Sequence, residues 1–283
     1  MLKRSGISFI LICIASVTSF SQSVKLFTTT QALKDSVEKK YLDSGAHKYS
    51  YFSDKWNLYI DSAIAITPDD DFLWEEKAMP YFKARKYEVG MQYLDIAVQL
   101  NPKKNLDYRG FIKCVFSKTY KDAIVDLEGA EKLNGNFTMK EHPYSFYIGL
   151  SYLALNQLDS AELFFNKTID VENTDGGAAL VHFMDWFYLG IVNYEKKNYQ
   201  IAIDYFDKAL TRYPDFSEAE YYKSICMNKL HMKMEDVMKV YDNARADFQH
   251  GYSFTEDNCV YEKYPYQLSP YMVRSDNIFS IMP

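Results

Sequence analysis

The sequence lacks the short motifs that mark common enzyme active sites. It contains no GxxxxGKS or GxxxxGKT phosphate loop, no GxGxxG, no GxSxG nucleophile elbow and no HExxH metal motif. Histidines occur singly, one to a segment, at His47, His142, His182, His231 and His250. Each is therefore expected to be a surface or turn residue rather than a ligand. Since no convergent set of polar residues is apparent, we expect no enzymatic activity, catalytic residue, metal site or cofactor.

Two acidic stretches lack the spacing of a calcium loop. A loop that starts at Asp69 needs Glu at position 80, which is Pro80, and a glycine at its bend, which is also missing. Residues 170–175 fail in the same way. We interpret Asp69-Asp70-Asp71 as the cap of a helix that carries Trp74, where negative charge interacts favourably with the helix dipole.

Cysteine is scarce, which excludes a disulfide-rich scaffold. No CxxC or Cys/His metal spacing occurs, and beyond the first residues only Cys114, Cys226 and Cys259 remain. A disulfide between Cys226 and Cys259 is compatible with an oxidising compartment, and buried free thiols are an equally good interpretation.

The first residues resemble a secretory signal. Lys3 and Arg4 precede an apolar run of 11 residues from Ile7 to Val17, and Ser19-Phe20-Ser21 offers the small-x-small pattern that signal peptidase needs. We predict a signal peptide over residues 1–21 and export to the periplasm, the cell envelope or the medium. The run is shorter than the roughly 20 residues that a membrane-spanning helix takes, and no transmembrane segment is expected in the mature chain.

Positive charge is also in short supply. The whole chain has 32 Lys and Arg against 38 Asp and Glu, and removing Lys3 and Arg4 gives 30 − 38 = −8. An acidic protein repels phosphate backbones, so nucleic acid is not an expected partner.

What the sequence does contain is a repeat. From Phe183 to Phe216, small and apolar residues fall in two groups followed by a proline: Trp186, Leu189 and Gly190, then Ala202, Phe206 and Ala209, then Pro214. Their spacing resembles the tetratricopeptide repeat of 34 residues, with one departure, Asn193, where the family usually has an aromatic residue. Apolar residues at intervals of three and four indicate two amphipathic helices, and Pro214 is expected to enforce the turn that follows.

Similar spacing recurs along the chain, and we expect a solenoid over residues 22–251. Its helix pairs are predicted near residues 37–70, 71–104, 105–139, 142–175, 183–216 and 217–250. The third has one extra residue between Gly110 and Ala123. No Asn-Gly or Asp-Gly turn separates two alternating runs, so no sheet is expected. The resemblance implies an all-α, right-handed superhelical solenoid of about six helix pairs.

The resemblance also implies a binding groove, which the first helix of each pair lines. The residues that match the inner wall are Phe72, Glu75, Met79, Phe82, Phe146, Leu150, Leu153, Phe187, Ile191, Tyr194, Tyr221 and Ile225. Such a wall is apolar and aromatic, and it suits an amphipathic helix or an extended apolar peptide. The Lys and Asn set with which chaperone-binding members hold a C-terminal carboxylate is absent. Aromatic stripes at helical spacing are also typical of a packed core.

Residues 252–283 have no sustained helical period, but they are rich in aromatic residues. Disordered tails are usually poor in aromatics, so this segment is expected to pack. The simplest expectation is a cap on the last helix pair; the alternatives are folding back into the groove and docking on a partner. The sequence thus predicts an exported scaffold for a protein or peptide partner, or alternatively a fixed subunit of an envelope complex that contacts neighbours by its outer faces and tail. It specifies neither the partner nor the oligomeric state.

Overall fold

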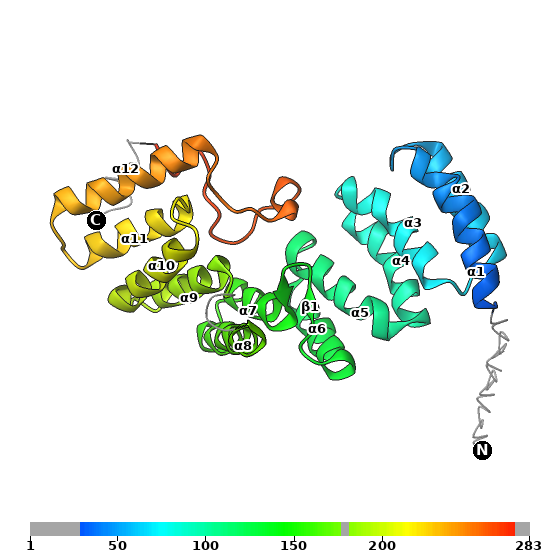
Figure 1. The fold of residues 1–283 in the computed structure, drawn as a ribbon, viewed down its shortest axis with the longest axis horizontal. Helices are drawn as coiled ribbons and strands as arrows, with labels where there is room; N and C mark the ends of the chain where they lie inside the picture. Colours follow the sequence, from blue (N-terminus) through cyan, green and yellow to red (C-terminus); the bar gives the residue numbers. More distant parts are fainter. Residues whose placement is uncertain (1–28, 177–180, 275–283) are drawn as a thin grey trace, which may run out of the picture.

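The computed structural model describes residues 29–176 and 181–274, which form a curved row of helices (Figure 1). The predicted signal peptide and the last nine residues lie outside the described residues. Twelve α-helices dominate the described part of the chain, so the expectation of an all-α fold is confirmed.

Consecutive helices pack as pairs, and each pair packs on the next. The helices are α1 (Gln31–Glu38), α2 (Asp54–Ile66), α3 (Asp71–Lys83), α4 (Tyr87–Leu100), α5 (Pro102–Phe111), α6 (Tyr120–Asn134), α7 (Tyr144–Ala154), α8 (Leu158–Gly176), α9 (Phe183–Glu195), α10 (Tyr199–Arg212), α11 (Ser217–Lys229) and α12 (Met234–His250). Short helical turns are η1 (Lys39–Asp43), η2 (Ala46–Lys48), η3 (Ile112–Phe116) and η5 (Asp257–Val260). One hydrophobic core runs from α3 to the C-terminal segment, and a smaller one joins α1, α2 and the start of α3.

Small residues let the paired helices approach closely. A Cβ atom built on Gly190 in α9 would lie 2.4 Å from Cε1 of Phe206 in α10. Ala202, on the facing side of α10, is fully buried. The closeness explains why the pattern needs Gly190 and Ala202 at these positions, since a larger residue would force the helices apart.

We expect Gly190→Ala to destabilise the fold by about 1–3 kcal/mol, because the added methyl collides with a buried ring that cannot move away. Urea unfolding followed by circular dichroism measures the loss. Gly129→Ala in α6 is the matched control, because its Cβ would meet only the mobile end of Leu106. That change should be neutral or slightly stabilising, since alanine favours a helix over glycine. Equal effects of the two substitutions would contradict this packing.

Helix ends follow the predicted chemistry. The Asp70 side chain accepts a hydrogen bond from the Phe72 backbone N–H and caps α3, as expected of the acidic stretch. Asp69 accepts from the Thr29 backbone N–H at 2.8 Å and joins the start of the described chain to this cap.

Two local features were not expected. Strands β1 (Thr138–Met139) and β2 (His142–Pro143) form a small antiparallel hairpin whose turn has Lys140 at φ 58°. A π-helical turn, η3, ends α5, and such a turn takes up one inserted residue. It lies between Gly110 and Ala123, where the repeat has its extra residue.

The three cysteines of the described chain are free. Cys114 and Cys226 are buried and Cys259 is partly buried, so of the two interpretations above, free thiols hold in this structure. Among the described helices, none combines the length and the apolar character that crossing a bilayer requires.

Candidate functional site

The C-terminal segment, residues 252–274, runs inside the arc of helices (Figure 1). Its side chains Phe254, Tyr264, Leu268 and Val273 are buried. The segment therefore packs, as expected. Its two ends pack on the last helix pair, through Glu218 of α11 and Tyr241 of α12. Between them it extends along the first helices of earlier pairs as far as the turn between α3 and α4. Its path therefore combines the expected cap with folding back into the groove.

Aromatic rings anchor the beginning of this segment. Phe254 lies 5.6 Å from Phe187 of α9, 5.3 Å from Phe216 and 5.8 Å from Tyr264, measured between ring centroids. Tyr188 of α9 donates a hydrogen bond to the backbone oxygen of Pro265 at 3.0 Å. Such aromatic pairs stabilise beyond their buried area, so the segment is firmly seated on α9.

A buried carboxylate holds the segment to α11. Glu218 is fully buried, and its Oε1 accepts hydrogen bonds from Ser253 Oγ at 2.6 Å and from the Leu268 backbone N–H at 3.1 Å. Burial raises the pKa of Glu218, and the hydrogen bonds oppose that rise. One side chain of α11 thus joins two distant points of the segment.

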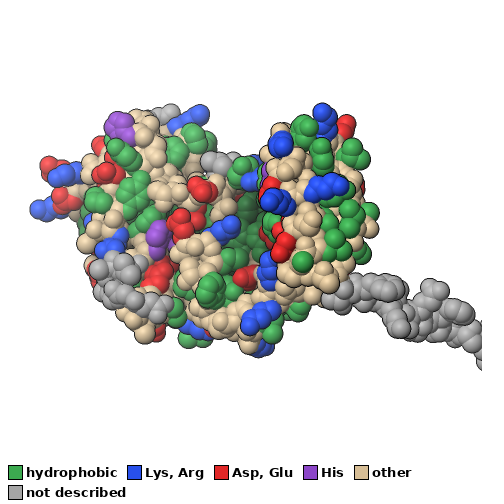
Figure 2. All heavy atoms as spheres, turned by 45° about the vertical axis from the view of Figure 1, so that its right-hand side comes forward, with side chains coloured by type: hydrophobic (Ala, Val, Ile, Leu, Met, Phe, Trp, Pro, Cys, Tyr) green, Lys and Arg blue, Asp and Glu red, His purple; other side chains and the backbone are tan. Residues whose placement is uncertain are grey.

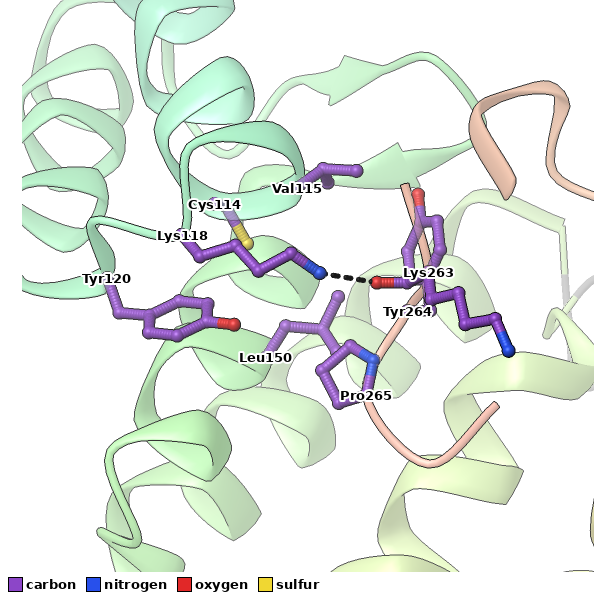
Figure 3. Close-up of a pocket in the computed structure, with 8 residues that line it drawn as sticks. All are labelled: Cys114, Val115, Lys118, Tyr120, Leu150, Lys263, Tyr264 and Pro265. Atoms are coloured by element: carbon purple, nitrogen blue, oxygen red, sulfur yellow. Dashed lines mark hydrogen bonds between the residues drawn. The ribbon is translucent and has the colours of Figure 1, made fainter. Parts of the chain in front are cut away.

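The middle of the segment crosses α7 and the turn after α5. Lys118 Nζ donates to the backbone oxygen of Lys263 at 2.7 Å (Figure 3). Beside it, a small pocket is lined by Cys114, Leu150 and Pro265, among others. Burial raises the pKa of the Cys114 thiol to about 12, which keeps it protonated and unreactive.

The tip of the segment, at Tyr261 and Glu262, reaches the α3–α4 turn before the chain runs back toward α12. The Lys83 Nζ lies 3.8 Å from the centre of the Tyr261 ring, and the Arg85 guanidinium donates to the Tyr261 backbone oxygen. Tyr87 donates to Glu262, which also lies 3.5 Å from Arg85 Nε. These polar contacts are more exposed than those on α9 and α11, so they orient the segment more than they stabilise it.

The predicted groove residues divide into two sets. The packed set has at most about one-twentieth of its surface exposed and consists of Phe82, Phe146, Leu150, Leu153, Phe187, Ile191, Tyr221 and Ile225. The partly exposed set consists of Phe72, Glu75, Met79 and Tyr194. Leu150 and Phe187 face the C-terminal segment. The packed set is thus not an open lining in this structure, because helix packing and the chain's own C-terminal segment occupy it.

An open hollow of about 430 Å³ remains on the N-terminal half of the concave surface, and Figure 2 shows the molecule hollowed there between its two masses. Its walls come from α3, α5 and the β1–β2 hairpin, and its lining is Glu75, Glu76, Met79, Lys104, Asp107, Tyr108 and residues 137–140. We call this the α3–α5 hollow. Of the predicted residues, Glu75 and Met79 lie in it.

The hollow is lined by three carboxylates, Glu75, Glu76 and Asp107, and by two lysines, Lys104 and Lys140. Burial and the charge of Glu75 raise the pKa of Glu76 to about 7, and burial also raises that of Glu75. Within the described chain, Glu76 Oε2 is buried without a hydrogen-bond partner, and the His47 imidazole Nε2 lies 3.9 Å away. A buried, unpaired carboxylate is costly, so the site is suited to a donor supplied from outside.

The residues that line the hollow from α5 were not predicted from the sequence. Lys104, Asp107 and Tyr108 belong to a repeat with an inserted residue, and no inner-wall positions could be transferred to it from the resemblance. The adjacent acids Glu75 and Glu76, in a helix otherwise rich in apolar residues, were the available signal.

One expectation about the histidines is wrong. His142 is a fully buried residue of β2; its ring stacks on that of Phe146 at 3.7 Å and meets that of His182 edge-on at 4.8 Å, measured between ring centroids. Burial lowers the pKa of His142, but the carboxylates of Asp185 and Glu256 outweigh it and raise the pKa to about 9. The unexpected hairpin carries this histidine into the core.

Comparisons with known proteins agree with this geometry. A family model described as tetratricopeptide repeat matches residues 184–216. The structure of PilW, a type IV pilus biogenesis factor, superimposes with a TM-score of 0.61 at 12% identity, over 78% of this chain and 96% of that one. This is a tetratricopeptide repeat fold. Pseudomonas aeruginosa pilF gives a TM-score of 0.54 at 12% identity, over 77% and 90% of the two chains.

A third similar structure is YrrB, described as a tetratricopeptide repeat protein with an unusual peptide-binding site. It superimposes with a TM-score of 0.50 at 16% identity, over 66% of this chain and 91% of that one. No curated protein matches the sequence. On this fold the concave surface is divided: α7, α9 and α11 carry the C-terminal segment, and α3 and α5 remain open.

Proposed function

We propose that this chain is an exported, non-enzymatic scaffold that binds a protein or peptide partner through its concave surface. The tetratricopeptide repeat fold supports an interaction role, and the peptide-binding site named for YrrB is one example on that fold. The predicted signal over residues 1–21 supports export. Cell fractionation with mass spectrometry of the N-terminus tests export, and a protein found only in the cytoplasm with residues 1–21 still attached would contradict this part of the proposal.

The proposal of a binding site rests on one observation: the concave surface is divided into a filled part and an open part. The C-terminal half is filled by residues 252–274, whereas the α3–α5 hollow is open and contains a carboxylate that no described residue hydrogen-bonds. Met79 and Tyr108 supply apolar contact beside Glu75 and Glu76. Apolar surface next to an unpaired charge is typical of a binding site.

These walls define the chemistry of the ligand. An extended segment with a lysine or arginine next to an apolar side chain places a cation on Glu76 and an apolar group on Met79. The cationic group satisfies the buried oxygen, and charge-assisted hydrogen bonds of this kind are among the stronger polar contacts. We therefore propose a basic-apolar peptide segment as the ligand of the α3–α5 hollow.

Peptide-library selection against the full chain tests this. We expect the selected peptides to pair Lys or Arg with an apolar neighbour, and Glu76→Gln to weaken their binding at least about 10-fold, as losing a buried charge partner does. Glu88→Gln on the exposed surface of α4 is the matched control and should leave binding unchanged.

The pH dependence has a defined sign. Because the pKa of Glu76 is raised to about 7, the free site is largely protonated at pH 6 and ionised at pH 8. Binding of the basic peptides should strengthen over that interval, and the change should be absent in Glu76→Gln. Peptides that bind both variants equally at both pH values would contradict the hollow as the site and favour a role as a fixed subunit that uses other faces.

A further inference from the structure

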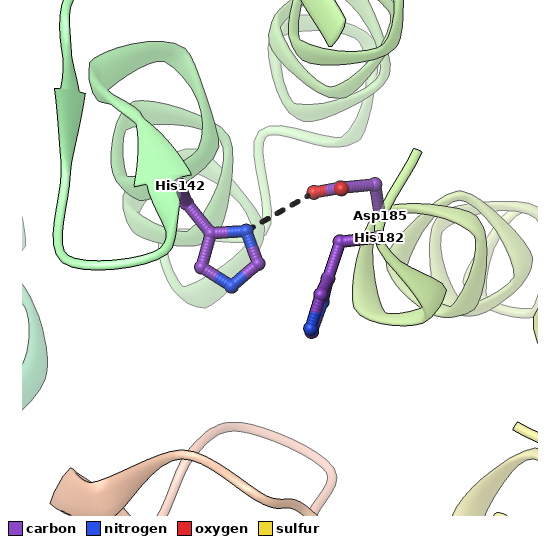
Figure 4. A group of neighbouring side chains, drawn as sticks. All are labelled: His142, His182 and Asp185. Carbon is purple, nitrogen blue, oxygen red and sulfur yellow. Dashed lines mark ion pairs between the residues drawn. The ribbon is translucent and has the colours of Figure 1, made fainter. Parts of the chain in front are cut away.

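Two histidines and an aspartate, His142, His182 and Asp185, lie close together between β2 and the start of α9 (Figure 4). His142 comes from β2, His182 caps the start of α9, and Asp185 lies one turn further along. One ligand atom from each of these three residues lies within 4.8 Å of the others. His142 Nδ1 is 3.6 Å from Asp185 Oδ1.

The cluster is buried and incompletely satisfied. His142 and Asp185 are fully buried, and within the described part of the chain neither Asp185 oxygen nor His142 Nδ1 has a hydrogen-bond partner. Buried polar atoms in native proteins nearly always have one. His142 Nδ1 and Asp185 Oδ1 face one another at 3.6 Å, beyond hydrogen-bond distance, so an ion placed between them would satisfy both atoms.

The charge balance indicates a cation. Besides Asp185, the acids around the two rings are Glu141, Glu172 and Glu256. The nearby positive groups are His142 itself and Arg212, which acts on His182. A divalent cation would offset the remaining negative charge.

We propose that His142, His182 and Asp185 form a binding site for a divalent transition-metal ion of the zinc class. Two imidazoles and one carboxylate, with a fourth position for water, are a ligand set that zinc accepts. Zinc ligands lie 2.0–2.2 Å from the metal, which places ligand atoms about 3.3 Å apart, so shifts of about 1 Å in the side chains bring these three into range.

A supporting carboxylate strengthens this assignment. His142 presents Nδ1 to Asp185, and its other nitrogen, Nε2, lies 3.2 Å from Glu256 Oε1. Metal-bound histidines commonly donate their free N–H to a carboxylate, which fixes the ring. Because Glu256 belongs to the C-terminal segment, metal binding at His142 would be coupled to the docking of that segment.

Zinc titration of the full chain, prepared without a histidine tag and freed of metal, tests the site. Competition with a chromogenic chelator should show about one zinc per chain, and zinc should raise the melting temperature. Asp185→Asn and His182→Gln should each weaken zinc binding at least about 10-fold, and Glu256→Gln about 10–100-fold, the effect usual for a supporting residue. His250→Gln, an exposed histidine at the end of α12, is the control and should bind as the wild type does.

The outcomes separate the alternatives. Circular dichroism establishes that each variant is folded, and because Asp185 and His182 lie at the start of α9 whereas Glu256 lies in the C-terminal segment, the misfolding of a variant in one element leaves the other element informative. Less than about a tenth of an equivalent of zinc on the wild type at micromolar zinc would overturn the proposal. Equal zinc affinity in the wild type and in the folded cluster variants would overturn it too, by showing that the ion binds elsewhere.

Discussion

Replacing Phe187 by alanine is expected to lower the free energy of unfolding by about 3–5 kcal/mol, the range for removing a buried aromatic ring. The side chain is fully buried, and its ring centroid lies 5.9 Å from that of Phe206 and 5.1 Å from that of Phe216. It therefore joins α9, α10 and the turn before α11. Urea unfolding followed by circular dichroism measures the change.

Leu163→Ala is the matched control for this prediction. Leu163 lies on α8 with 65% of its surface exposed, so its truncation should cost less than about 0.5 kcal/mol. A loss below 1 kcal/mol for Phe187→Ala would show that Phe187 faces an open groove, as the resemblance implied, and not a packed core.

Deleting residues 252–283 is expected to lower the melting temperature by about 4–8 °C, equivalent to roughly 2 kcal/mol in a chain of this size. The deletion uncovers Phe187, Tyr188 and Phe216, and it leaves the buried carboxylate of Glu218 without its donors from Ser253 and Leu268. Differential scanning calorimetry measures the shift. Binding of an apolar dye should increase, because a contiguous apolar patch is exposed.

A point substitution separates docking from chain length. Phe254→Ala should reproduce part of the loss of stability, because its ring contacts Phe187 and Phe216. Thr255→Ala, at the exposed neighbouring position, should have no effect. An unchanged melting temperature in both the deletion and Phe254→Ala would mean that the segment does not stabilise the helices.

The helix pairs were predictable because their signals are local. Gly190, Ala202 and Phe206 occur at intervals set by the helical period, and the close approach that they imply is visible in the sequence. The proline after α10 marks a turn for an equally local reason. Such features require no knowledge of the rest of the chain.

Which side of each first helix faces the groove, and which packs against the neighbouring helices, could not be predicted in the same way. Inner-wall and packing positions are neighbours on one helix, and both are apolar here, so burial alone distinguishes Phe187 from Met79. The path of the C-terminal segment could not be predicted from the sequence for another reason. Its contacts join residues that are far apart in the chain: Arg85 and Tyr261 are 176 residues apart. No local period encodes such a pairing.

The histidine cluster could not be predicted either, because it too is formed by residues that are far apart in the sequence. Its residues come from β2, the start of α9 and the C-terminal segment, and the hairpin that positions His142 has no Asn-Gly or Asp-Gly turn to reveal it. Only His182 and Asp185, three residues apart at the start of one helix, offered a local hint.

The central claim is that the chain's own C-terminal segment occupies the concave surface over α7, α9 and α11. Lysine crosslinking followed by mass spectrometry tests it directly, because Lys118 and Lys263 are both exposed and Lys118 Nζ lies 2.7 Å from the Lys263 backbone oxygen. Mixing light and heavy isotope-labelled protein distinguishes links within one chain from links between chains. We predict that Lys263 links mainly to Lys118 of the same chain. Links from Lys263 to Lys229 or Lys239 of the last helix pair, without a link to Lys118, would contradict the claim.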